Sequence, residues 1–357
     1  APLTKSAEAV LALRLVTSVL PEPAVGGGNA ATPLRDQVSL SLGQTLALNY
    51  LRDISSAQAK VLRGRVSLGA NMDSNAALPP EGVQATVQLD RLDLDAWETV
   101  LAQATGAGLG GAGTETLSYL PRSLMLRTQE LNVGGKKLNK LLLNGSREGA
   151  LWRANIESAE LSGQVEYRQP SGSGEGRVMA RLSRLSMAPA AAADMEALLN
   201  EQPASIPALD IVVEDFELRG KRLGRVEISA VNRGGGAAEG DVREWRLNKF
   251  NVTLPEAVFT ASGNLVSLNA QATPGAAKSS GANSVALKRR TVMSFKLDIS
   301  DAGELLNRFG MKDVVRKGRG KMEGQVAWLG SPITLDYGSM GGAFTVKALG
   351  DYLFLNE

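Results

Sequence analysis

Three closely spaced aspartates, Asp90, Asp93 and Asp95, are of a type that can bind calcium or transfer protons. A calcium loop also needs a glycine at its sixth position and a glutamate at its twelfth, and neither follows here. Strand alternation accounts for the aspartates, and Asp95 with Glu98 fits the N-cap and third position of a helix. The pattern favours a structural role and predicts no metal site.

A glycine-rich motif at residues 106–111, Gly-Ala-Gly-Leu-Gly-Gly, matches the spacing of a dinucleotide-binding loop. That loop must follow a strand and open a helix, because the helix N-terminus holds the pyrophosphate. Here the motif follows an expected helix and leads into more glycine. We therefore interpret residues 106–111 as a linker and expect no nucleotide cofactor.

The residue counts exclude most catalytic centres, because the 357 residues contain no histidine and no cysteine. Catalytic triads, zinc sites, haem ligation and thiol chemistry depend heavily on these side chains. The remaining carboxylates, Glu157, Glu160, Glu166, Asp210 and Glu227, are spread along the polar sides of strands instead of converging as a glycosidase pair would. The sequence predicts no enzyme and no cofactor.

A basic run begins at Lys312 and continues through Arg316, Lys317, Arg319 and Lys321. Such side chains beside an apolar groove can hold phosphate head groups, and Lys312, Arg316, Lys317 and Arg319 are the candidates. The competing interpretation is a solvated turn whose charges keep strand edges from pairing with other chains. A net charge of +2 does not indicate a nucleic-acid partner.

The elements that must position these residues are strands whose apolar side chains fall on every second position. Successive strand residues point to opposite faces, so each segment has one apolar and one polar face. This alternation is typical of antiparallel sheets with one solvated face, and it predicts a mainly β fold. It occurs in residues 152–157, 161–167, 209–213, 226–230, 293–299, 322–328 and 333–337.

The chain is longer than the ~250–300 residues at which single cores stop growing, so it holds two domains or a repeat. The segment from Glu130 to Leu138 matches the segment from Asp215 to Leu223, each a strand, a Gly-Lys turn and a second strand. Trp152 then corresponds to Trp245, and Leu161 to Ala261. We interpret this as one structural unit used at least twice.

Short helices are expected near residues 95–105, 189–200 and 301–309. Asp301 and Glu304 form a second capping box, and Gly310 lies where a helix end requires positive φ. The longest apolar stretch, residues 9–20, is shorter than the ~20 residues that cross a bilayer and contains Arg14. We expect a strand or a short helix there.

Three consecutive segments resemble the YhdP family of AsmA-like proteins from the Gram-negative envelope. They are MSFKLDISDAGELLNRFGM from Met293 to Met311, GKMEGQVAWLGSP from Gly320 to Pro332, and LDYGSMGGAFTV from Leu335 to Val346. Residues 146–163 and 218–230 resemble the family more loosely. The resemblance covers roughly residues 118–346.

The resemblance implies an elongated, antiparallel, repeating β-groove, a taco-like twisted sheet with a few short capping helices. It implies an inner-membrane-anchored periplasmic protein that carries phospholipid acyl chains between inner and outer membranes, without nucleic acid or catalysis. Residues 1–117 would form an N-terminal groove segment with flexible loops, and 118–187 and 208–346 repeated groove units. Residues 347–357 would be a tail outside the resemblance, and the chain a fragment of a larger protein.

Strand phase then predicts which side chains line the groove. The alternative is a structural or adhesive β-solenoid or sandwich of the cell envelope, in which the same stripe is a closed core. A polysaccharide-active protein has little support from four scattered tryptophans. The predicted lining residues are Trp152, Ile156, Leu161, Val165, Ile211, Val213, Phe216, Leu218, Val226, Ile228, Phe295, Leu297, Ile299, Val326, Trp328 and Leu335.

Overall fold

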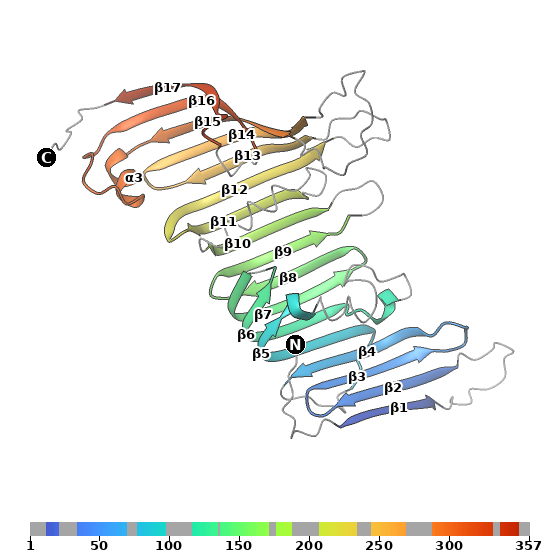
Figure 1. Ribbon diagram of the computed structural model, residues 1–357. Helices are drawn as coiled ribbons and strands as arrows, with labels where there is room; N and C mark the ends of the chain where they lie inside the picture. The colour runs from blue at the N-terminus through green and yellow to red at the C-terminus, as the bar shows by residue number, and fades with distance from the viewer. Residues whose placement is uncertain are drawn as a thin grey trace, which may run out of the picture. The chain divides into compact units, whose positions relative to one another are not determined.

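The structure is a computed structural model, and its strands fall into two compact units, Ala1–Ala159 and Glu160–Glu357 (Figure 1). The predicted mainly β fold is confirmed. The structure describes residues 12–20, 34–69, 77–97, 116–134, 136–170, 176–187, 207–233, 244–268, 288–330 and 336–349.

The first unit contains eight described strands that pair in chain order. A 3-10 helix, η1 (Thr116–Tyr119), lies between the fifth and sixth strands in the chain. The strands are β1 (Leu13–Leu20), β2 (Arg35–Leu42), β3 (Leu46–Asp53), β4 (Lys60–Gly69), β5 (Gly82–Asp93), β6 (Ser123–Val133), β7 (Lys136–Glu148) and β8 (Leu151–Glu157).

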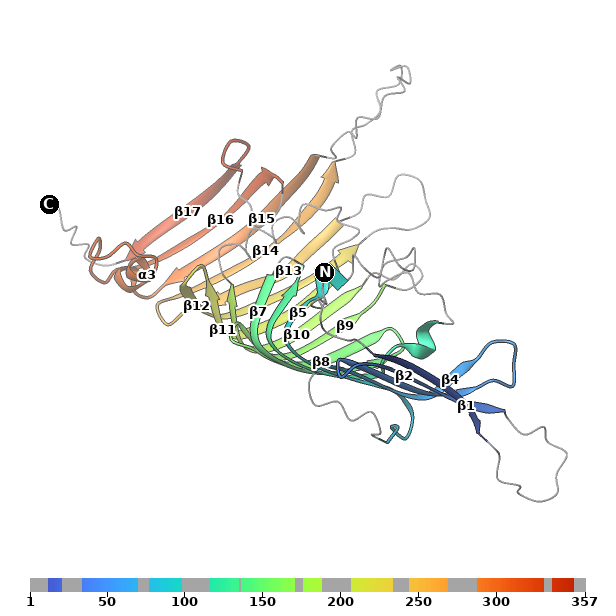
Figure 2. The same cartoon turned by 60° about the horizontal axis from the view of Figure 1, so that its bottom comes forward.

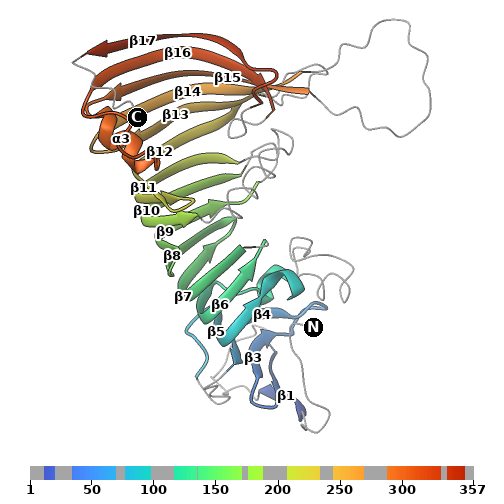
Figure 3. The same ribbon diagram turned by 60° about the vertical axis from the view of Figure 1, so that its left-hand side comes forward.

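The second unit contains nine described strands, also paired in chain order, and its sheet is open because the two outermost strands do not pair with each other. Figure 3 shows that β13 to β17 are curved along their length. The strands are β9 (Leu161–Arg168), β10 (Arg177–Met187), β11 (Ala208–Leu218), β12 (Lys221–Arg233), β13 (Glu244–Thr253), β14 (Ala257–Leu268), β15 (Lys288–Ile299), β16 (Arg319–Leu329) and β17 (Gly341–Leu349).

Neighbouring strands are antiparallel, as predicted, except at three parallel pairs: β4–β5, β5–β6 and β10–β11. A parallel pair requires a crossover long enough to return the chain to the same end of the sheet. The second and third of these pairs coincide with two of the places where the sequence predicts a helix, near residues 95–105 and 189–200. Residues 98–115 and 188–206 lie outside the described part of the chain, so those two helices stay predictions beyond residue 97.

The predicted repeat has a direct structural counterpart. The segment beginning at Glu130 is the hairpin β6–β7, and the segment beginning at Asp215 is the hairpin β11–β12. Gly134 and Gly220 occupy the two turns with φ of 56° and 75°, a backbone region in which glycine has no steric cost. Each hairpin is entered through a parallel pair, so both copies share pairing direction as well as sequence.

One predicted helix start is confirmed and the other is wrong. Asp301 caps α3 (Ala302–Arg308) by accepting a hydrogen bond from the Glu304 N–H, and Gly310 follows with φ of 92°. At the first helix, whose residues 94–97 are described, Asp93 is the cap and accepts from the Ala96 N–H. Asp95 instead accepts from the Gly134 N–H in the β6–β7 turn at 2.7 Å, a long-range contact that local spacing does not reveal.

Two other local predictions have mixed outcomes. Within residues 9–20 the described part forms strand β1. The predicted strand at 333–337 is wrong at its end, because Tyr337 lies in a turn in which the Ser339 N–H donates to the Asp336 carbonyl. Residues 333–335, including Leu335, lie outside the described residues.

Candidate functional site

The candidate site is one face of the sheet in the second unit, on which apolar side chains from successive strands align in rows. We call it the apolar face. Cross-strand register sets its rows, since directly paired residues lie on the same side of a sheet. One row runs through Phe250, Ala261, Phe295, Gly324 and Phe344, one residue from each of β13 to β17.

Three further rows extend this face over the same strands. Every position in them is apolar or glycine except one threonine, whose hydroxyl donates to the Gly330 carbonyl. The rows are Val252–Phe259–Leu297–Met322–Val346, Leu247–Gly263–Met293–Val326–Gly342 and Trp245–Leu265–Thr291–Trp328.

Every described residue predicted to line a groove in the second unit lies on this face. The pairing of β9 with β10, of β10 with β11 and of β11 with β12 extends it from the rows above to the first strands of the unit. The residues are Leu161, Val165, Ile211, Val213, Phe216, Leu218, Val226, Ile228, Phe295, Leu297, Ile299, Val326 and Trp328.

Bulges do not break the face, because the apolar spacing changes from two to three residues where they occur. The register shifts between Val213 and Phe216 on β11, and between Leu247 and Phe250 on β13. An extra residue in one strand would otherwise turn all later side chains to the opposite face. The sequence compensates at each of these bulges, so Phe216 and Phe250 return to the apolar face.

The apolar face is partly open from β13 to β17. Phe295, Leu297 and Val326 are only half-buried, and Phe344 on the last strand is 63% exposed. Side chains between two packed sheets would be almost fully buried. Full burial occurs in the row from Trp245 to Trp328, of which Trp328 is 1% exposed, and on the first strands of the unit, where Val213 and Val226 are each 2% exposed.

Aromatic rings give the middle of the face a continuous surface. Phe250 and Phe259 meet edge to face with ring centroids 5.8 Å apart, and Phe259 stacks with Phe295 at 6.3 Å. Gly324 pairs with both Phe295 and Phe344, and a Cβ there would lie 2.5 Å from the Phe344 Cβ. Glycine therefore allows the Phe344 side chain to lie close over the backbone of β16.

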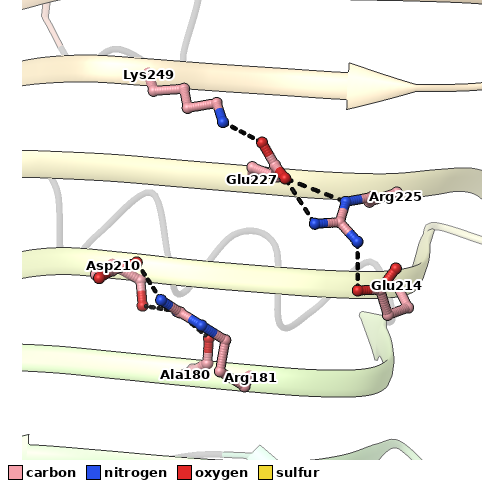
Figure 4. Close-up of polar contacts among 7 residues, drawn as sticks. All are labelled: Ala180, Arg181, Asp210, Glu214, Arg225, Glu227 and Lys249. Atoms are coloured by element: carbon pink, nitrogen blue, oxygen red, sulfur yellow. Dashed lines mark hydrogen bonds and ion pairs between the residues drawn. The ribbon is translucent and has the colours of Figure 1, made fainter.

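The opposite side of the same strands carries charges, and we call it the charged face. Figure 4 shows Glu227 on β12 contacting Lys249 on β13 and Arg225, which in turn contacts Glu214 on β11 at 2.5 Å. The hydrogen bond from Lys249, reinforced by Arg225, lowers the pKa of Glu227. These groups are partly exposed, so each pair contributes little to stability and mainly keeps this face solvated.

Similar pairs continue along the charged face. Arg181 donates to the Asp210 carboxylate and carbonyl at 2.9 Å each. Asp298 contacts Lys296 at 3.0 Å and Lys321 at 3.1 Å, and these two lysines lower its pKa, Lys296 having the larger effect. The contrast between the two faces therefore extends over β10 to β16.

Helix α3 is clamped at one end of the strands, as Figure 2 shows. The Arg308 guanidinium forms a two-point ion pair with Glu256, in the β13–β14 turn, and donates to the Arg222 carbonyl at 3.2 Å. The hydrogen bond from Arg308 is the main cause of the lowered pKa of the buried Glu256. This ion pair fixes the loop that follows α3.

The predicted head-group contacts divide into two sets. Lys312, Arg316 and Lys317 are exposed in the loop between α3 and β16. Arg319 lies on β16 at a position that shares the charged face with Lys321, so register does not place it among the apolar rows. The structure therefore groups three of the four cations.

The first unit also has an apolar side, and it contains the predicted residues Trp152 and Ile156. Ile156 pairs with Leu143, and Trp152 pairs with Arg147, whose guanidinium lies 5.5 Å from the Trp152 ring centre. Like Phe295 and Val326, both predicted residues are half-buried.

A polar cluster interrupts the apolar side of the first unit on β2 and β3. The buried Asp36 accepts two hydrogen bonds from Arg52, at 3.0 and 2.6 Å, and Arg52 also reaches the Tyr119 hydroxyl at 3.4 Å. Hydrogen bonding to Asp36 raises the pKa of Arg52. Tyr119 packs edge to face on Tyr50, so the segment containing η1 covers this part of the sheet.

Sequence reasoning missed the contributions of β13 and β14 to the apolar face. On β13 the spacing Trp245, Leu247, Phe250, Val252 runs two, three, two, which simple alternation does not recognise. On β11 the same three-residue step separates Val213 from Phe216, but there it follows the regular alternation from Leu209 to Val213. The missed residues include Trp245, Leu247, Phe250 and Val252 on β13 and Phe259 on β14.

The described residues contain no group of three or more acidic side chains that could hold a metal ion. In the same part of the chain, no helix has both the length and the apolar character needed to cross a bilayer. What the arrangement offers chemically is a wide apolar surface with a solvated reverse side. Such a surface binds apolar groups without directional contacts.

An unclosed sheet with one apolar face and one charged face defines the class of protein as an open, mainly antiparallel β-sheet protein. The chain belongs to the YhdP family, because the family described as YhdP protein matches residues 2–349. The resemblance inferred from the sequence is thereby confirmed. No curated protein and no solved structure shows a significant match to the chain.

Proposed function

We propose that the second unit holds lipid acyl chains along its apolar face, as a segment of a periplasmic, inner-membrane-anchored AsmA-like protein. The protein carries phospholipid between the inner and outer membranes and catalyses no reaction. The observation that carries the proposal is the set of three partly exposed apolar rows from β13 to β17, those that begin at Leu247, Phe250 and Val252. An acyl chain laid on them removes this surface from water.

The dimensions of the face suit acyl chains. On β15 the apolar positions from Met293 to Ile299 cover six residue steps, or about 20 Å at ~3.3 Å per residue. One leaflet's hydrocarbon is half of a ~30 Å core, or about 15 Å. Each buried CH₂ group contributes roughly 0.8 kcal/mol, so even partial contact with a long chain is favourable.

Rows that repeat from strand to strand allow a chain to move without meeting a charged side chain. The polar head groups would stay in water beyond the ends of the strands. We propose that Lys312, Arg316 and Lys317, at the α3 end, contact passing phosphate groups. Lining by Phe295, Val326 and the other predicted residues is part of the same proposal.

The alternative is a structural or adhesive protein of the cell envelope with a closed core. It requires a second layer over the apolar face, and the half-burial of Phe295 and Leu297 argues against such a layer.

The test is native mass spectrometry with lipid extraction on the chain expressed in a Gram-negative periplasm. We expect co-purifying phospholipid, and we expect Phe295→Asp and Val326→Asp to lose most of it. Gln325→Asp, one residue from Val326 but on the charged face, is the matched control and should keep its lipid. A stably folded, lipid-free wild-type chain would overturn the proposal in favour of the closed core.

A further inference from the structure

A cluster of exposed cations and exposed apolar side chains lies at the α3 end of the second unit. It comprises the β11–β12 turn, residues 219–222, and the loop after α3, residues 309–317. We call it the end patch. The hydrogen bond from Arg308 to the Arg222 carbonyl joins the two segments, and Lys221 Nζ lies 3.2 Å from where a Cβ on Gly310 would be. Figure 3 shows α3 beside the end of β12.

Apolar and basic residues are interspersed in the loop after α3. Phe309, Met311 and Val314 are 48%, 48% and 49% exposed, although side chains of this kind are usually buried in a folded chain. Lys312 and Arg316 lie between or beside them and are exposed as well. This combination is typical of segments that insert apolar side chains at a membrane interface while cations meet the head groups.

The end patch has a large positive net charge. Its two segments contain six cations and one acidic residue, Asp313. Arg308, which belongs to α3, is already paired with Glu256 and is not counted. A surface of this charge is complementary to an anionic partner, and an anionic leaflet attracts such clusters within a Debye length.

The loop is also held in a defined shape. The Asp313 N–H donates to the Asn307 side chain at 3.2 Å, and the Gly303 N–H donates to the Lys317 carbonyl at 3.1 Å. Asp313 and Lys317 adopt positive φ, 58° and 56°, which fixes the direction of the side chains around them. The exposed residues are therefore presented together by a structured loop.

We propose that the end patch docks on the surface of a lipid bilayer that contains anionic phospholipid. The proposal goes beyond acyl-chain binding by the apolar face and does not depend on it. Docking would bring the α3 ends of the strands, and the row from Val252 to Val346 beside them, close to the head groups of a membrane.

The experiment is vesicle flotation with the whole chain, using phosphatidylcholine vesicles with and without 30 mol% phosphatidylglycerol. We expect binding to the anionic vesicles that weakens as salt rises. Each cation near an anionic surface contributes roughly fivefold, so Lys312→Glu combined with Arg316→Glu and Lys317→Glu, which reverses three charges, should weaken binding by at least about 100-fold. Met311→Ser with Val314→Ser should weaken binding to both vesicle types.

Two controls separate the alternatives. Arg290→Glu reverses one exposed cation at the far end of β15, nine residues from Ile299 at the α3 end, and should change binding by less than about twofold. Phe295→Asp should leave vesicle binding intact even where it abolishes lipid co-purification, so the two proposals fail separately. Equal binding to both vesicle types, or an unchanged triple variant, would overturn membrane docking. If the triple variant instead loses a protein partner while still binding vesicles, the end patch is a protein interface.

Discussion

The apolar sides of the two units differ in what lies on them. In the second unit the rows from β13 to β17 contain apolar side chains, glycine and one threonine. In the first unit, Asp36 and Arg52 lie on the apolar side, and Tyr119 extends from the η1 segment to cover it. The apolar side of a sheet can therefore stay open, as in the second unit. In the first unit it is covered by a segment held through the hydrogen bonds among Asp36, Arg52 and Tyr119, which we call the clamp.

The two units differ in where a buried carboxylate forms its ion pair. A buried carboxylate is stable only when it is paired, and Arg52 provides two hydrogen bonds to Asp36. The second unit has its comparable ion pair, Glu256 with Arg308, at the end of the strands, where it fixes α3 without entering the rows. We infer that the position of the ion pair decides whether the face stays available.

The largest effect is expected from breaking the clamp of the first unit. Asp36→Ala leaves the Arg52 guanidinium without its partner, which should lower the unfolding free energy of this unit by about 3 kcal/mol. Urea unfolding followed by hydrogen exchange of β2 and β3 measures the change. Asp36→Leu with Arg52→Leu should recover most of the loss, and a double variant as unstable as Asp36→Ala would contradict this account.

The next largest effect is expected on lipid binding, in which the apolar sides of the two units should differ. Val326→Asp in the second unit should reduce co-purifying lipid about tenfold, because it interrupts an open row, whereas Leu48→Asp on β3 should reduce it less than twofold. Lipid per protein is measured by extraction and mass spectrometry. Equal losses would mean that both units hold lipid alike.

The ion pair of the second unit should respond to acid. The folded-state pKa of Glu256 lies below its ordinary value of 4.5, mainly because of Arg308. Its contribution is therefore complete above about pH 4.5 and is lost as the pH falls through the lower folded value. Wild type should exceed Glu256→Gln by about 1 kcal/mol in unfolding free energy at pH 7, and the urea midpoints of the two proteins should converge as the pH falls below the lowered folded-state pKa. A constant difference across this range would exclude the ion pair as the cause.

The smallest effect is expected on the charged face. Glu227→Gln should change the unfolding free energy by less than about 1 kcal/mol, because its partners Lys249 and Arg225 are largely exposed. Thermal unfolding at low and high salt measures this. A loss larger than that of Glu256→Gln would show that the charged face is structural.

The sequence predicts well which face of a strand each side chain lies on. It predicts poorly whether two neighbouring strands pair in parallel or antiparallel. Alternation placed Phe295 and Val326 on one side because the two-residue period is a property of the backbone. The parallel direction of β10 and β11 depends on a crossover, which local periodicity does not encode. For a similar reason Asp93 and not Asp95 caps the helix, since Asp95 accepts a hydrogen bond from the Gly134 N–H in a distant turn.

Parts of the site were also missed because they depend on structure that local periodicity does not encode. Residues such as Phe250 were missed because a bulge changes the spacing from two to three. The cations Lys312, Arg316 and Lys317 were recognised by density alone, while the exposure of Met311 and Val314 beside them required the folded loop. Whether the predicted lining residues contact lipid stays a prediction.

The bulges affect where the strands can tolerate the insertion or deletion of a residue. Between Val213 and Phe216, two residues of β11 occupy the place that regular pairing gives to one. A one-residue deletion inside a regular strand exchanges the two faces of everything that follows. At a bulge, a lost or gained residue can be absorbed by the local bend, with both faces kept. Insertions and deletions within strands of related sequences should therefore collect at these positions.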